Sequence, residues 1–269
     1  MYLLKAPSSD GMPPFFFQYF WSTCGEVVTS TVLDFLNHGM SPPNFNDTHI
    51  VLIPKIKEPK HVFDYRPISL CNVAYKIVSK AIANRLKKFL PSIISDTQSA
   101  FMHGRLITAN VLVVFETMHH ISRKKRDKLG EITIKLDMSK AYDRAKCFLE
   151  KMGFDVKWRS LIMQCITTVS YAIKINGCPR GRIIPSRGIR QGDSLSPYLF
   201  LLCAEGLLAL IKASVCNGSM ERIAICHGVL SFPIYFLLTI ASFFAKHLLQ
   251  NATQCKKFWG YMSVARVSS

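Results

Sequence analysis

The chain has 269 residues, 49% of them apolar, which is enough for one large domain or two small ones with a buried core. Lys and Arg outnumber Asp and Glu by 34 to 17, and the formal net charge of +17 favours nucleic acid as a partner, with an anionic membrane surface second and a merely basic protein as the plain alternative. The nine cysteines include no C-x-x-C pair, so a zinc site has no support, and we expect reduced thiols and an intracellular location, nuclear or cytoplasmic.

The first half of the chain is predicted to contain mainly helices. A helix is expected near residues 27–36 and a short strand at 50–53. Helical periodicity then runs from 73 to 90, where Pro91 is expected to end the helix. A further helix is expected from 106 to about 121.

The second half is predicted to mix strands with one long helix. Apolar and polar residues alternate over 131–137, which predicts a half-buried strand with Asp137 at its end. Strands at 171–175 and 182–184 flank an Asn-Gly pair, which predicts a hairpin with a loop longer than two residues. A mostly buried helix is expected from 195 to 213.

Asp137 is the first candidate for chemistry. A carboxylate at the end of a strand can hold Mg²⁺, which activates an attacking oxygen and neutralises a leaving pyrophosphate in phosphoryl transfer. An isolated aspartate at such a place is more often a helix cap or a surface residue. The hypothesis therefore depends on the whole string around it, Leu136-Asp137-Met138-Ser139-Lys140-Ala141-Tyr142-Asp143-Arg144.

Two further strings offer ligand-binding groups. In the string from 185 to 200, glycine permits a close approach of the backbone to a ligand, and Gln191 can contact a base or sugar. Lys55 and Arg66 can clamp a triphosphate, the arginine by bidentate contact. The plain alternatives are a loop before a capped helix and two solvated surface charges.

Taken in order, these strings resemble the reverse transcriptase domain of plant LINE-type (non-long-terminal-repeat) retrotransposons over residues 1–227. The resemblance depends on the aspartate string and on six further segments: Lys5-Ala6-Pro7 with Asp10-Gly11, Ile53-Pro54-Lys55, Arg66-Pro67-Ile68-Ser69-Leu70, Gln98-Ser99-Ala100-Phe101, Gly104-Arg105 and Arg190-Gln191-Gly192-Asp193.

The resemblance implies an α+β fold of the right-hand polymerase type, with a fingers-like region at 1–125, a palm core at 126–228, a disrupted palm remainder at 229–269 and the thumb absent. It implies RNA-directed DNA polymerase activity, in which two Mg²⁺ ions help to add deoxynucleotides to a primer 3′-hydroxyl. The expected partners are an RNA template, a DNA primer and deoxynucleoside triphosphates, with no stable protein partner.

The resemblance also implies roles for single residues. Asp137 is the catalytic, metal-binding aspartate, and Tyr142 screens the 2′-hydroxyl of the incoming nucleotide. Gln191 and Gly192 line the nucleotide and template pocket. Lys55 and Arg66 contact the triphosphate. The expected nucleotide-binding residues are therefore Tyr142, Gln191, Gly192, Lys55 and Arg66.

Two departures from the family pattern stand out. Four or five residues are missing after Arg144, so the helix that follows is expected to start out of phase. The Ala-Asp-Asp string that supplies further metal ligands in the family does not occur in the chain. We therefore expect a reverse transcriptase fragment that does not complete the reaction.

The sequence suggests why the Ala-Asp-Asp string is missing. Codons for residues 232–241, read one base out of frame, permit Ser-His-Leu-Phe-Phe-Ala-Asp-Asp-Ser, so we expect residues 229–242 to be an out-of-frame translation of that motif. Two alternatives stay open: a non-catalytic basic remnant that binds nucleic acid, and a protein anchored in a membrane through residues 229–249.

Overall fold

The computed structural model describes residues 6–123, 131–136, 145–185 and 190–218, together with short strands between 223 and 267. The chain forms two compact units. The first joins Met1–Lys88 to Lys146–Leu199, and the second joins Phe89–Ala145 to Phe200–Ser269. Both units contain helices and sheet, so the predicted α+β fold class is confirmed.

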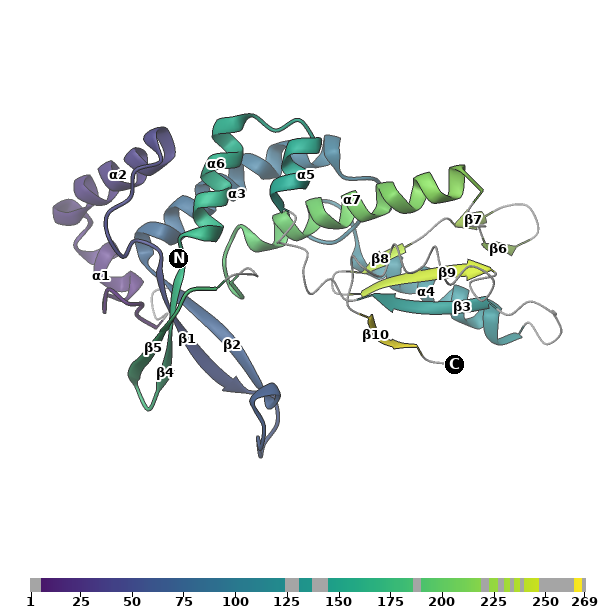
Figure 1. Ribbon diagram of the computed structural model, residues 1–269, viewed down its shortest axis with the longest axis horizontal. Coiled ribbons are helices and arrows are strands. Elements are labelled where there is room, and N and C mark those ends of the chain that lie inside the picture. Colours follow the sequence, from purple (N-terminus) through teal and green to yellow (C-terminus); the bar gives the residue numbers. More distant parts are fainter. Residues whose placement is uncertain are drawn as a thin grey trace. The chain divides into compact units, whose positions relative to one another are not determined.

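A four-stranded sheet organises the first unit, with strand order β2-β1-β4-β5 (Figure 1). Strand β1 (Asp47–Pro54) pairs antiparallel with β2 (Tyr65–Cys71) and parallel with β4 (Ser170–Ile175). Strand β5 (Cys178–Ile183) completes the sheet beside β4. The parallel pairing of β1 with β4 therefore joins two segments that lie far apart in the sequence.

Local chemistry explains two features of this sheet that differ from the expectations. The β4–β5 hairpin has a two-residue turn, because Asn176 and Gly177 both adopt positive φ angles, 49° and 81°, as a type I′ turn requires. The prediction of a longer loop was wrong. Strand β2 was not predicted, and it can contain Pro67 because it lies at the sheet edge.

The first unit also contains helices α1 (Pro14–Tyr19), α2 (Trp21–His38), α5 (Ala145–Lys151) and α6 (Val156–Thr167), the 3₁₀ turn η1 (Val62–Asp64) and most of α3 (Val73–Ile93). The side chain of Asp155 begins α6 by accepting a 2.8 Å hydrogen bond from the Lys157 amide. Apolar side chains of α2, α3, α5 and α6 are buried and form the core: Val32, Phe35, Val78, Ile82, Leu86, Leu149 and Ile162.

Helix α3 continues through Pro91, so the prediction that this proline ends the helix was wrong. The Ile94 amide donates to the Leu90 carbonyl at 2.8 Å, which carries the helical bonding past the proline. Proline removes only its own amide bond, and the burial of Leu90 and Ile94 holds the last turn in place.

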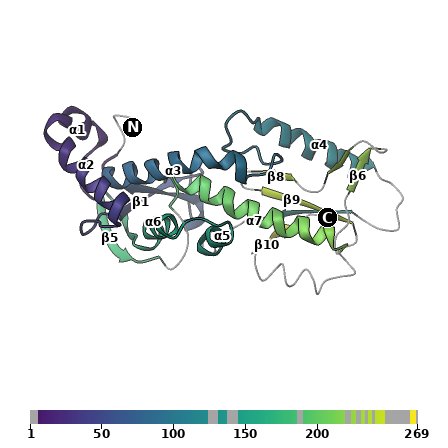
Figure 2. The same cartoon turned by 90° about the horizontal axis from the view of Figure 1, so that it is seen from above.

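The second unit contains α4 (Ile107–Arg123), most of α7 (Ser196–Cys216) and a second sheet. Its strand order is β10 (Val264–Val267), β3 (Glu131–Leu136), β9 (Ile240–Lys246) and β8 (Tyr235–Leu237), and α4 lies beside β8 (Figure 2). Strands β6 (Ile223–Cys226) and β7 (Leu230–Phe232) form a separate pair. These elements confirm the helices predicted at 106–121 and 195–213 and the strand predicted at 131–137, with no end differing by more than three residues.

Among the residues that the structure describes, one helix is long and apolar enough to cross a membrane by length and composition. It is α7, and half of its most apolar window is buried. Leu201, Leu202, Leu208 and Ile211 of this helix are at most 2% exposed, as expected for a core helix. Of the segment 229–249, which was the alternative membrane anchor, the described residues form strands β7, β8 and β9.

Candidate functional site

Lys55 and Arg66 lie together at the far end of the β1–β2 hairpin. Ile53 pairs directly with Arg66, and Lys55 lies two residues beyond Ile53, so strand alternation places Lys55 and Arg66 on one face. The Lys55 amide donates to the Asp64 carbonyl at 2.8 Å, which extends the pairing beyond the strand ends. Both cationic side chains are exposed, so the hairpin presents two positive charges to solvent.

Gln191 and Gly192 form a turn at the outer edge of the same hairpin. The Ser69 amide of β2 donates to the Gln191 carbonyl at 3.1 Å. Both turn residues are exposed, and Gly192 has a φ of +100°, which favours glycine. Arg66 lies three residues from Ser69, roughly 10 Å along an extended strand. The structure thus brings four predicted nucleotide-binding residues to one hairpin.

Arg190 anchors this turn from inside the unit. The side chain is 4% exposed, and it donates to Thr48 Oγ1 at 3.0 Å, to the Cys165 carbonyl at 2.8 Å and to Asn46 Oδ1. Its guanidinium carbon lies 3.9 Å from the centroid of the Tyr75 ring, a cation–π contact. Arg190 therefore joins strand β1, helix α3 and helix α6 to the start of the turn.

Asp193 anchors the other end of the turn. It accepts a 2.6 Å hydrogen bond from the Tyr75 hydroxyl and a 3.2 Å bond from the Leu195 amide, just before α7. Ser196 Oγ donates to the Arg190 carbonyl at 3.0 Å, which closes the loop on itself. In the string Arg190-Gln191-Gly192-Asp193, the outer pair is buried and fixed and the inner pair is exposed.

The electrostatics of this buried cluster keep its donors protonated. Burial raises the pKa of Tyr75 well above its ordinary value, and the negative charge of Asp193 raises it further. Burial opposes the charge on Arg190, but Tyr75, Cys71 and Asp193 outweigh that effect and raise the pKa of Arg190. Both side chains therefore remain donors at any physiological pH.

The cluster is a support and not a binding pocket. The cavity lined by Tyr75, Cys165, Tyr171, Arg190 and Asp193 has a volume of about 10 Å³, room for about one water molecule. The buried side of the turn therefore has no room for a nucleotide, whereas Gln191 and Gly192 are exposed. Sequence reasoning assigned no role to Arg190 and Asp193, although both belong to the quoted string, and it held no signal for Tyr75.

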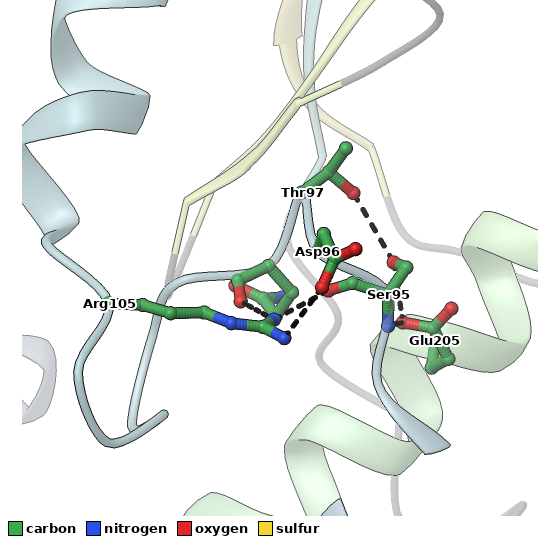
Figure 3. A network of polar contacts seen from close by, with 6 residues as sticks. Ser95, Asp96, Thr97, Arg105 and Glu205 are labelled. Atoms are coloured by element: carbon green, nitrogen blue, oxygen red, sulfur yellow. Dashed lines mark hydrogen bonds and ion pairs between the residues drawn. The ribbon is translucent and has the colours of Figure 1, made fainter. Parts of the chain in front are cut away.

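A second polar network orders the loop from 95 to 105, within the second unit (Figure 3). Arg105 Nη1 donates to the carbonyls of Ser95 and Gln98, both at 2.7 Å, and Arg105 Nη2 forms a 3.0 Å ion pair with Asp96. The amide and hydroxyl of Ser95 donate to Glu205 of α7 at 3.1 and 3.0 Å. Arg105 and the Gln98 carbonyl thus hold the shape of this loop, and Ser95 attaches the loop to α7.

The remaining predicted site residues, Asp137 and Tyr142, lie outside the described residues. Strand β3, which leads directly to Asp137, is present as expected. Within the part of the chain that the structure describes, no group of three His, Cys, Asp or Glu side chains could hold a metal ion. Asp193 does not suit one either, because its oxygens accept from Tyr75 and Leu195 beside the charged Arg190.

Comparison with known proteins gives a family match. The family model described as reverse transcriptase (RNA-dependent DNA polymerase) matches residues 54–227, nearly two thirds of the chain. The matched range includes Arg66, Gln191, Gly192 and the Tyr75–Arg190–Asp193 cluster. The hairpin, the turn and the buried support therefore all lie within, or within a few residues of, one family segment.

Three relatives are similar to the chain. A transposon TX1 protein of 149 kDa from Xenopus laevis is 28% identical over 98% of the chain, and a retrovirus-related Pol polyprotein from the R2 retrotransposable element of Nasonia vitripennis is 26% identical over 70%. An uncharacterised mitochondrial protein of Arabidopsis thaliana is 51% identical over 54 residues, which are 20% of the chain and 44% of that protein. The chain spans about a fifth of the length of the TX1 and R2 proteins, 20% and 18%.

Proposed function

The chain belongs to the reverse transcriptase (RNA-dependent DNA polymerase) family, and from that premise we propose that its β1–β2 hairpin and Gln191–Gly192 turn bind a deoxynucleoside triphosphate. Its relatives identify it more narrowly as a reverse transcriptase domain of the non-long-terminal-repeat retrotransposon type. The observation that carries the proposal is the 3.1 Å bond from the Ser69 amide to the Gln191 carbonyl, which fixes the turn to the strand that contains Arg66.

The cationic end of the hairpin supports phosphate binding. The Arg66 guanidinium can donate two parallel hydrogen bonds to phosphate oxygens. The Lys55 ammonium donates to the Phe63 carbonyl at 2.8 Å, and this bond uses one of its three protons. The ammonium is thus held in place with further protons to donate to a triphosphate.

The turn supports contact with the sugar and base. Gly192 lacks a side chain that would separate a nucleotide from the backbone, and Gln191 offers an amide with two donors and an acceptor oxygen. Because Arg190 and Asp193 hold both ends of the turn, this surface is already formed before the nucleotide arrives. Preorganisation of this kind lowers the entropy cost of binding.

Reverse transcriptases work on a nucleic acid template and primer with divalent metal ions, and we propose an RNA template, a DNA primer and Mg²⁺ for this chain. Asp137 would hold the metal. The metal would activate the primer hydroxyl and stabilise the negative charge on the leaving pyrophosphate. Tyr142 would screen the 2′-hydroxyl of the nucleotide. We retain the fingers-like and palm regions at 1–125 and 126–228 as part of the proposal.

We further propose that this chain binds its ligands without completing the reaction, because the Ala-Asp-Asp string does not occur in the sequence. Ligand binding and the polymerase reaction can be tested by separate experiments. Primer extension on an RNA template with Mg²⁺ or Mn²⁺ should give no product above that of the Asp137→Ala variant. Extension by the parent chain that disappears in Asp137→Ala would overturn the proposed loss of activity.

Triphosphate binding is tested separately, by titrating a fluorescent deoxynucleotide into the full chain. Arg66→Ala should weaken binding by roughly tenfold, because it removes a charge-assisted hydrogen bond. Arg182→Ala is the matched control, since Arg182 is an exposed arginine on β5, at the opposite edge of the same sheet. Equal losses in both variants would show that only net charge matters and would overturn the assigned site.

Two points concern origin. We propose a plant source, which the quoted strings and the similarity to the Arabidopsis protein support. We also propose that residues 229–242 are an out-of-frame reading of the Ala-Asp-Asp motif. The nucleotide sequence tests this directly: codons for residues 237–240 that cannot spell Ala-Asp-Asp one base out of frame would end the idea.

A further inference from the structure

The loop that joins β1 to β2 presents apolar and aromatic side chains to solvent. Val62 is 80% exposed and Phe63 71% exposed, beyond the strand ends at Pro54 and Tyr65. Folding therefore leaves apolar surface at the hairpin tip in contact with water. The tip is therefore suited to contact a ligand.

The tip has a fixed shape. Asp64 Oδ2 accepts from the amides of Lys60 and His61 at 2.9 and 2.8 Å, and the Asp64 amide donates to the His61 carbonyl at 3.0 Å. The Lys55 ammonium bonds the Phe63 carbonyl on the other side of the hairpin. These bonds hold the 3₁₀ turn Val62–Asp64 in place, so its side chains are positioned before any ligand binds.

The rings of His61 and Phe63 form a stacked pair. Their centroids lie 5.0 Å apart and their planes differ by 16°. Because Phe63 is mostly exposed, an incoming planar ring can extend the stack. Base stacking on aromatic side chains is one of the sequence-independent contacts by which proteins hold single-stranded nucleic acid, together with cations along the backbone.

The charges around the tip are mainly positive and therefore suit a polyanion such as a nucleic acid. Four exposed cationic side chains lie in or beside the loop, against two acidic ones: Lys55, Lys57, Lys60 and Arg66, against Glu58 and Asp64. The four cations outnumber the two carboxylates, and one oxygen of Asp64 is already engaged by two backbone amides. Cations that follow a phosphate backbone beside aromatic rings are the usual composition of a single-strand site.

We propose that the His61–Phe63 pair, with Lys57 and Lys60, binds an unpaired base of a single-stranded nucleic acid and its flanking phosphates. The proposal rests on the proposed function, because the family copies a template strand, and it assigns one contact with an unpaired strand to named residues of this chain. It adjoins the triphosphate site, which uses Lys55, Arg66, Gln191 and Gly192, because the Lys55 ammonium donates to the Phe63 carbonyl. That bond uses only the backbone of Phe63, so a substitution of the Phe63 ring tests the tip without removing a group of the triphosphate site.

The test is fluorescence anisotropy of the full chain with labelled oligonucleotides of about ten nucleotides. Phe63→Ala should weaken binding of single-stranded RNA roughly fivefold to a hundredfold, as expected for the loss of one stacked base. The same variant should bind a blunt double-stranded RNA as the parent does, because paired bases offer no free face. Phe63→Trp should restore single-strand binding, and a parallel titration with single-stranded DNA shows whether the sugar matters.

Matched variants separate stacking from charge and from folding. Phe115→Ala removes a 69% exposed phenylalanine from α4 and should leave RNA binding unchanged. Lys57→Ala and Lys60→Ala should each reduce the salt dependence of binding, whereas Phe63→Ala should leave the slope against log salt as it is. Thermal unfolding of Phe63→Ala should match the parent, since little of this side chain is buried.

Two outcomes would overturn the proposal. In the first, Phe63→Ala and the parent bind single-stranded RNA equally well. In the second, Phe63→Ala abolishes self-association of the chain in sedimentation and leaves RNA binding intact, which would make the tip a protein-docking surface. Loss of triphosphate binding in Arg66→Ala is unaffected by either result, so failure here is distinguishable from failure of the proposed function.

Discussion

The hydroxyl of Tyr75 donates a 2.6 Å hydrogen bond to the carboxylate of Asp193, across 118 positions of sequence. Tyr75 lies in helix α3 and is 1% exposed, and Asp193 ends the turn that presents Gln191 and Gly192. The ring of the same tyrosine packs against the Arg190 guanidinium. One buried side chain thus contacts both ends of the exposed turn and helps to fix the position of Gln191 and Gly192.

Tyr75→Phe should lower the free energy of unfolding by about 1–3 kcal/mol, because it leaves the buried Asp193 carboxylate without one of its donors. The ring and its contact with Arg190 remain, so the fold should survive. Urea unfolding at neutral pH measures the change. Tyr19→Phe is the control, since Tyr19 is 71% exposed, and a loss as large in that variant would contradict the assigned role of the hydrogen bond.

Arg190→Lys should destabilise the fold although it keeps the positive charge. Lysine has no planar fork, so it cannot keep the bonds to Thr48, Asn46 and the Cys165 carbonyl together. We expect a loss of about 3 kcal/mol in the free energy of unfolding, and weaker triphosphate binding in the fraction that stays folded. Arg182→Lys, on exposed β5, should change neither; a neutral result for Arg190→Lys would show that charge alone supports the turn.

Gly192→Ala should weaken triphosphate binding and stability together. The backbone at Gly192 has a φ of +100°, whereas the nearest atom to an added methyl group, the Ser69 carbonyl oxygen, lies at an unstrained 3.8 Å. The cost, about 1–3 kcal/mol, therefore comes from backbone conformation and not from a clash. Gly181→Ala, at φ +69° with open space around it, should lose similar stability and keep nucleotide affinity. Equal affinities in the two variants would argue against a role for the turn in binding.

Periodicity predicted the elements that are held by their own apolar faces. Helix α3 follows from a repeat of three to four residues and strand β3 from a repeat of two, while helix α7 follows from its long apolar run with Pro197 in the first turn. None of the three needs a distant partner to be recognised. Strand β2 was missed because Arg66 and Pro67 weaken a strand pattern, and only its place at the sheet edge makes them acceptable. Whether a strand lies at the edge or in the centre depends on the assembled sheet, so the local sequence of β2 could not predict it.

The residues of the candidate site were likewise only partly predictable from the sequence. Motif order indicated Lys55, Arg66, Gln191 and Gly192, and the structure places the first two on the β1–β2 hairpin and the last two in a turn bonded to its edge. The supporting cluster could not be predicted, because Arg190 in a polar string reads as a surface charge and Tyr75 as an ordinary helix residue. Both roles depend on the parallel pairing of β1 with β4, which joins residues 47–50 to 170–173. No local pattern encodes a contact of that range.

The buried thiol of Cys165 predicts a loss of stability in alkali. Burial raises its pKa from 9.0 to about 12 in the folded chain, so between these values the unfolded chain gives up a proton that the folded chain keeps. The stabilising effect is complete below pH 9 and is lost as the pH rises through that window. The free energy of unfolding should fall by roughly 1.4 kcal/mol per pH unit for such a group. Tyr75 acts in the same direction, since its pKa is also raised by burial.

Denaturant unfolding at pH 8, 9, 10 and 11 would measure this slope. Cys165→Ala should flatten it relative to the parent chain, because the thiol that resists ionisation is gone. Cys147→Ala is the matched control, since Cys147 is exposed and its removal should leave the slope unchanged. If Cys165→Ala and the parent lose stability at the same rate above pH 9, the thiol is not buried beside Arg190 and Tyr75 in solution, and the packing of α6 against the cluster must differ.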